Sequence, residues 1–132
     1  MINLLLLLLI CPLHPIFPTL MGVSMDGYLS QYAQAPTDAT IAYRQESGDI
    51  PQDLSPYAGV IAVENCAYVG HDAYLYVGDS WYRVLVFDCL GRDVQPNWMQ
   101  ENNIIAEMGY YLTKDLGYTG IGGIDARLVV VK

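Results

Sequence analysis

The residues best suited to chemistry stand at the end of one apolar stretch, YRVLVFDCLG, at residues 82 to 91. The apolar run 84–87 predicts a strand that is buried on both faces and that carries Asp88 and Cys89 at its tip. A carboxyl group among apolar neighbours is desolvated and holds its proton more readily, as a general acid for glycosidic cleavage requires. Asp88 is therefore a candidate catalytic residue. The alternative is that Asp88 caps the following turn by accepting backbone N–H bonds, and both hypotheses stay open.

Other side chains could assist such a site. Glu107 precedes a predicted helix and could face the same groove, although the helix dipole also favours a carboxylate at this place for structural reasons. His71, the one histidine after residue 24, is a weaker candidate. Four aromatic residues could stack on sugar rings, namely Tyr68, Trp81, Tyr82 and Trp98. Each of them could equally be a core or half-buried strand residue.

Cys66 and Cys89 are the two cysteines that follow residue 24. In an oxidising compartment such a pair predicts a disulfide, which would stabilise the fold by about 3 kcal/mol. Two cysteines and one histidine do not complete a zinc site, so we expect no metal. We also expect no cofactor, because the glycine-rich run 117–123 follows a predicted helix and does not open one, as a phosphate-binding loop would.

The charge balance narrows the range of partners. The 132 residues include 14 acidic and 6 basic side chains, which gives a net charge of −8. An acidic surface repels phosphate backbones and anionic lipids, so nucleic acid is not an expected partner. The opening segment, MINLLLLLLICPLHPIFPTLMGVS, contains an apolar run of signal-peptide length with small residues at 22–24. We expect residues 1–24 to be a signal peptide or, if they are not cleaved, a membrane anchor, and the protein to be secreted.

The rest of the chain divides into two parts. Residues 25–58 are rich in turn-forming residues and predict a loop-rich region with short extended pieces at 28–32 and 40–44. From residue 59 onward we expect strands at 59–65, 73–77, 81–88, 103–107 and 126–131, with a tight turn at 78–80. One helix is expected at about 109–116. These elements indicate a mainly β domain with about six short strands and one short helix.

The order of these elements resembles the double-psi β-barrel superfamily, in particular the rare-lipoprotein-A, expansin and barwin group. The stretch VLVFD resembles that group's V-x-V-x-D strand, IAEMG resembles its strand-to-helix corner, and LGYTGIGGIDARLVVV resembles its closing strand. The resemblance covers residues 59–132, and it implies that Asp88 occupies the place of the group's active-site aspartate. The histidine of the lytic members has no counterpart here, because its place falls near Asn65 or Cys66.

The resemblance implies a six-stranded double-psi β-barrel that either binds cell-wall polysaccharide such as peptidoglycan or both binds and cleaves it. If the protein is an enzyme, the implied activity is lytic or hydrolytic cleavage of glycosidic bonds with Asp88 as the acid. The alternative is a non-catalytic secreted effector or protein-binding module whose acidic surface meets a basic partner. The sequence makes no prediction about the oligomeric state or the particular sugar.

Overall fold

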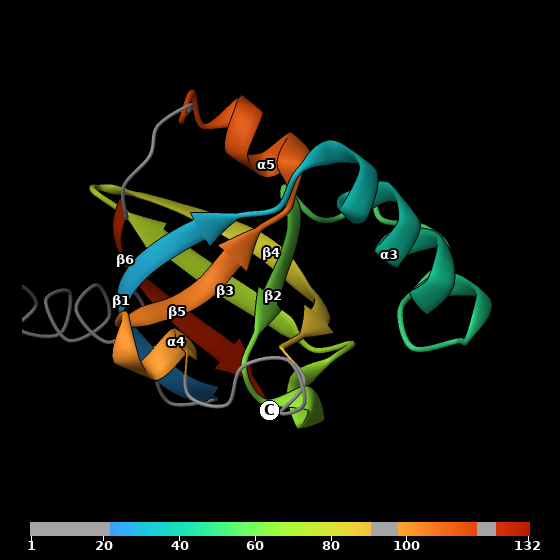
Figure 1. Cartoon of the computed structure of the whole chain (residues 1–132), viewed down its shortest axis with the longest axis horizontal. Coiled ribbons are helices and arrows are strands. Elements are labelled where there is room, and N and C mark those ends of the chain that lie inside the picture. Colours follow the sequence, from blue (N-terminus) through green and yellow to red (C-terminus); the bar gives the residue numbers. More distant parts are fainter. Residues whose placement is uncertain (1–21, 91–97, 119–123) are drawn as a thin grey trace, which may run out of the picture.

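The strands of the protein close into a barrel (Figure 1). The computed structural model describes residues 22–90, 98–118 and 124–132. Within these residues the strands are β1 (Gly22–Gln31), β2 (Gly59–Val63), β3 (Asp72–Val77), β4 (Ser80–Cys89), β5 (Ile104–Met108) and β6 (Ile124–Val131). The helices are α3 (Gln34–Glu46), the 3-10 turn η1 (Cys66–Tyr68), α4 (Trp98–Glu101) and α5 (Tyr110–Asp115). The predictions of a mainly β fold and of six strands are confirmed.

The strand order around the barrel is β1-β5-β2-β4-β3-β6, and β6 pairs with β1 to close it. Two pairs are parallel, β1 with β5 and β2 with β4, and the other four are antiparallel. Among the strands that the structure describes, only β3 and β4 are neighbours both in the chain and in the barrel. Val77 pairs with Ser80, so the predicted hairpin has a two-residue turn in which Gly78 adopts a φ of 58°.

Two apolar clusters lie on opposite faces of the barrel wall. The inner cluster fills the barrel and includes Val84 and Val86 of β4. The outer cluster consists of Ile50, Val60, Ala62, Leu85 and Phe87, and α3 and the loop after it pack on this cluster through Ile41 and Leu54. The apolar run of β4 is therefore continuous because alternate side chains enter different clusters, and both faces of this strand are buried.

The region before β2 differs from the prediction. Residues 40–44 were expected to be extended, but they lie within α3. Ala33 at the N-cap makes no side-chain cap hydrogen bond, so no capping signal marks the start of α3. The helix is held by contacts from distant elements: the buried Thr37 hydroxyl accepts a hydrogen bond from the Tyr110 N–H at 3.0 Å. The expectation of one short helix is likewise wrong, since α3, α4 and η1 accompany α5.

The barrel also begins earlier in the chain than residue 59. Strand β1 lies between β5 and β6, so residues from 22 onward belong to the barrel. Gly22, Val23 and Ser24, which were expected to close the signal segment, pair with Val131, Val130 and Val129 of β6. The expected signal residues 1–21 lie outside the described residues.

Helices α3 and α5 lie on two different sides of the barrel (Figure 1). Figure 1 shows α5 at one end, at the top of the view, and α3 beside the barrel at the right. Helix α3 contacts β4 and α5, and α5 contacts β2. Asp88 lies near the end of β4, the strand that contacts α3, and Glu107 lies near the end of β5.

Candidate functional site

A break in strand pairing decides where Asp88 points. Val86 pairs with Ile61, but the next pair along β2 joins Ala62 to Asp88, so Phe87 is an extra residue in β4. Such a bulge moves the following side chain to the other face of the sheet. Because Ala62 belongs to the outer cluster, the bulge places Asp88 on the outer face of the barrel, under α3.

Both oxygens of the Asp88 carboxylate accept hydrogen bonds from side chains. Arg44 Nη2, on α3, donates to Oδ1 at 2.7 Å, and the hydroxyl of Tyr32 donates to Oδ2 at 2.9 Å. The Arg44 and Asp88 side chains are only 18% and 20% exposed, so this ion pair is largely shielded from water. Asp88 is therefore a paired carboxylate that joins β4 to α3 and to the segment after β1.

Arg44 links several parts of the same region. Its Nη1 donates to Asp49 at 2.9 Å, and its Nη2 lies 3.9 Å from Cys89 Sγ. Cys89 is bonded to Cys66, which confirms the predicted disulfide. The disulfide joins the end of β4 to η1, so the tip of β4 is fixed by a covalent bond next to the ion pair.

Glu107 stands across β2 from Asp88. Ala62 pairs with Asp88 on one side and with Glu107 on the other, which puts the two backbones two strand spacings apart, about 10 Å. Burial raises the pKa of Glu107, and the negative charge of Asp88 raises it further. Burial and the charge of Asp88 also raise the pKa of Tyr32, which keeps its hydroxyl protonated as a donor.

These four side chains, Tyr32, Arg44, Asp88 and Glu107, form the carboxylate cluster. It contains one carboxylate that is paired with a cation and one carboxyl group that holds its proton more readily than usual. Such a division between two acids is the arrangement that acid catalysis uses. The surroundings of Asp88 differ from the expected apolar setting, because a cation and a hydroxyl occupy its oxygens. The turn that Asp88 was suggested to cap begins at residue 91, outside the described residues.

An exposed aromatic surface lies elsewhere on the barrel, on the outer face of the hairpin. Trp81 is 60% exposed, its ring centroid lies 5.5 Å from that of Tyr74, and it pairs across the hairpin with Tyr76. We call Tyr74, Tyr76 and Trp81 the ring surface. Two arginines flank it: Arg83 pairs with Tyr74, and Arg127 pairs with Tyr76. Each arginine is bound to an aspartate, Asp72 and Asp26 respectively, so they add no unpaired charge.

The other predicted site residues are dispersed. Tyr82 and Tyr68 are partly buried and pack against the inner cluster, on the opposite face of the barrel wall from Trp81. Trp98 is half-buried at the start of α4. His71 Nδ1 lies 2.8 Å from the carbonyl oxygen of Val131, and its ring contacts Tyr68. The His71 side chain thus contacts β6 and η1, and within the described residues it makes no hydrogen bond to the carboxylate cluster.

Two members of the carboxylate cluster were not predicted. Tyr32 is one of 11 tyrosines and has no distinguishing sequence context, and Arg44 lies in the region expected to be loop-rich. The small number of basic residues could have drawn attention to Arg44. With 6 Lys and Arg in an acid-rich chain, few cations are available to pair with a buried carboxylate. No three His, Cys, Asp or Glu side chains within the described ranges are placed to hold a metal ion.

The chain was compared with known proteins. It matches no protein-family model, no curated protein and no solved structure. Among the helices that the structure describes, none has the length and apolar character needed to cross a membrane.

Proposed function

We propose that this protein is a secreted double-psi β-barrel protein that binds cell-wall polysaccharide through its ring surface. The observation that carries the proposal is the exposure of Trp81 beside Tyr74 on the hairpin of β3 and β4. Most of this large ring is open to solvent, at 60% exposure, and a flat aromatic face with a polar edge is suited to stacking on a sugar.

The double-psi assignment is supported by two features together. The strand motifs of residues 59–132 resemble the superfamily, and the described strands form two parallel pairs and one hairpin. Parallel pairs require connections that cross from one end of the barrel to the other. The disulfide between Cys66 and Cys89 is consistent with an oxidising compartment and so supports export.

The charges around the ring surface favour a particular kind of polymer. Arg83 and Arg127 are bound to Asp72 and Asp26 at 2.6 and 2.8 Å, so neither cation is left to attract an anionic chain. The ring surface can therefore recognise a polymer through ring stacking and hydrogen bonds. The proposal is therefore a glycan that is recognised through its sugar faces and hydroxyl groups, as in the backbone of peptidoglycan.

Binding is favoured over cleavage by the state of Asp88. A general acid must offer a proton to the leaving oxygen, but the oxygens of Asp88 already accept bonds from Arg44 and Tyr32. Cleavage is the second candidate, supported by the raised pKa of Glu107 beside the paired carboxylate of Asp88. In that scheme Glu107 would be the acid and Asp88 the charge-stabilising partner.

A sedimentation assay with purified insoluble wall polysaccharide tests the proposal. We expect the wild-type protein to bind and Trp81→Ala to lose at least tenfold in affinity. Tyr43→Ala is the matched control, because Tyr43 is equally exposed, at 61%, but lies on α3, away from the ring surface. Absence of wild-type binding to every wall polymer, or an equal loss in the two variants, contradicts the proposal.

The same samples separate binding from cleavage. Soluble fragments are measured by chromatography after incubation of the polymer with wild type, Asp88→Asn and Glu107→Gln. For a binding protein we expect no fragments from any of them and near-normal binding by both variants. Fragment release by wild type that falls at least a hundredfold in Glu107→Gln would establish the cleavage alternative.

A further inference from the structure

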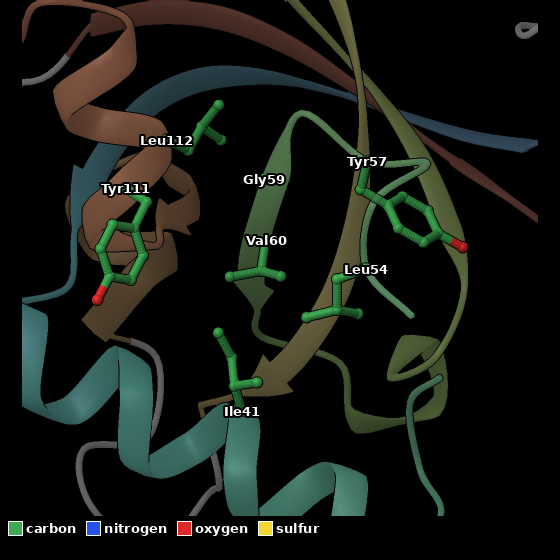
Figure 2. A pocket seen from close by; sticks show the side chains of 7 residues that line it. All are labelled: Ile41, Leu54, Tyr57, Gly59, Val60, Tyr111 and Leu112. Atoms are coloured by element: carbon green, nitrogen blue, oxygen red, sulfur yellow. The ribbon is translucent and has the colours of Figure 1, made fainter. Parts of the chain in front are cut away.

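An apolar cavity opens between α3, α5 and β2, with the Tyr57 ring as part of its lining (Figure 2). Its volume is about 140 Å³. Figure 2 shows its lining, which comes from α3, the loop before β2, β2 itself and α5: Ile41, Leu54, Tyr57, Gly59, Val60, Tyr111 and Leu112. Neither the ring surface nor the carboxylate cluster contributes a residue to it.

The cavity wall offers a ligand almost no polar partner. The two lining hydroxyl groups, of Tyr57 and Tyr111, point away from its centre in Figure 2 and are bonded to Asp72 and Asp38. The rings of these tyrosines therefore line the cavity, while their polar ends are satisfied at its rim. Whatever enters must be apolar.

The size of the cavity restricts the occupant further. Pockets for drug-sized ligands usually enclose about 300–1,000 Å³, whereas an apolar cavity of about 150 Å³ accommodates one benzene molecule. A space of this size suits one apolar side chain, such as leucine or phenylalanine. A side chain reaches a surface cavity as part of a peptide or protein.

Charged side chains at the rim of the cavity also restrict which ligand can bind. Asp38 is bonded to the lining Tyr111, Asp53 precedes the lining Leu54, and Asp72 is bonded to the lining Tyr57. Arg83 pairs with Asp72, but neither Asp38 nor Asp53 has an ion-pair partner among the residues that the structure describes. Lys114 and Asp115 at the end of α5 offset each other. The rim is therefore net negative in a chain that is itself strongly acidic.

We propose that this cavity is a docking site for a basic peptide segment of another protein, which inserts one leucine- or phenylalanine-sized side chain between positively charged flanks. The negative rim disfavours a second copy of this chain, which has a net charge of −8, and it disfavours an anionic membrane surface. The proposal is independent of polysaccharide binding, because the two sites share no residue.

Binding of defined peptides to the full chain tests the proposal. The probes are fluorescently labelled Lys-Lys-Gly-Phe-Gly-Lys-Lys, the same peptide with serine in place of phenylalanine, and a version with glutamate in place of every lysine. We expect the first peptide to bind at least tenfold more tightly than the other two, since burial of one apolar side chain corresponds to about one to two decades in affinity. Its affinity should also fall as salt is raised.

Variants locate the site on the protein. Ile41→Phe fills the cavity and Asp38→Asn removes a rim charge, and each should weaken the phenylalanine peptide severalfold or more. Asp125→Asn is the matched charge control, because Asp125 is exposed on β6. Methyl NMR signals of Leu54, Val60 and Leu112 should shift on addition of the peptide, which also reports whether Ile41→Phe is folded. Equal affinity for the phenylalanine and serine peptides, or unchanged methyl signals at saturation, overturns the proposal.

Discussion

The ion pair between Arg44 and Asp88 should hold α3 on the barrel, and replacing Arg44 tests this directly. Arg44→Met keeps most of the apolar stem but removes the cation, and it leaves Asp88 with Tyr32 as its described donor. Loss of one partner from a fully buried pair typically destabilises a protein by about 3–5 kcal/mol, whereas surface pairs contribute little. With side chains 18% and 20% exposed, this pair is closer to the buried limit.

Allowing for the residual exposure, we expect Arg44→Met to lower the free energy of unfolding by about 2–3 kcal/mol. For a domain of this size that loss lowers the melting midpoint by about 8–12 °C. Arg127→Met is the control, because Arg127 and Asp26 form a pair of similar length but are 55% and 65% exposed. We expect no measurable shift from that variant. Thermal and urea unfolding, with the disulfide intact, give both values.

A double variant distinguishes the ion pair from general packing by α3. In Arg44→Met with Asp88→Asn neither residue leaves the charge of the other unpaired, so the combined loss should be smaller than the sum of the two single losses. If the stability loss of the double variant equals the sum of the two single losses, the two side chains are not coupled and the reasoning is refuted. An Arg44→Met midpoint within error of that of Arg127→Met would refute the inference that Asp88 is shielded.

Three further outcomes are expected. Reduction of the bond between Cys66 and Cys89 should lower the free energy of unfolding by about 3 kcal/mol, measured by urea titration with and without reductant, and an unchanged midpoint would contradict this. The pKa of Glu107 is raised in the folded state, so its protonated form stabilises the fold below about pH 4. This stabilisation is lost as the pH rises through the folded-state pKa. Glu107→Gln should therefore be more stable than wild type at pH 7 and equally stable at pH 4. Gly109→Ala should lower the free energy of unfolding by about 1–3 kcal/mol, because the added Cβ would lie 2.7 Å from Val60 Cγ2. An unfolding midpoint equal to that of wild type would contradict this.

Local sequence patterns were enough to predict several elements of the fold. The two-residue turn at Gly78 and Asp79, the apolar strands β2 and β4 and the helix α5 follow from turn residues and periodicity, which act between near neighbours. The disulfide followed from the cysteine count, because only one pairing remained after the opening segment.

The surroundings of Asp88 and the presence of α3 depend on contacts between residues that are far apart in the sequence. The bulge at Phe87 exists because β2 and β4 pair in parallel at a particular register, and it turns Asp88 outward to meet a cation that lies 44 residues earlier in the chain. Helix α3 lacks a capping side chain and is stabilised where Thr37 and Arg44 contact α5 and β4. Such contacts join residues that are far apart in the sequence, so they cannot be predicted from local sequence patterns. These residues meet only when the barrel closes.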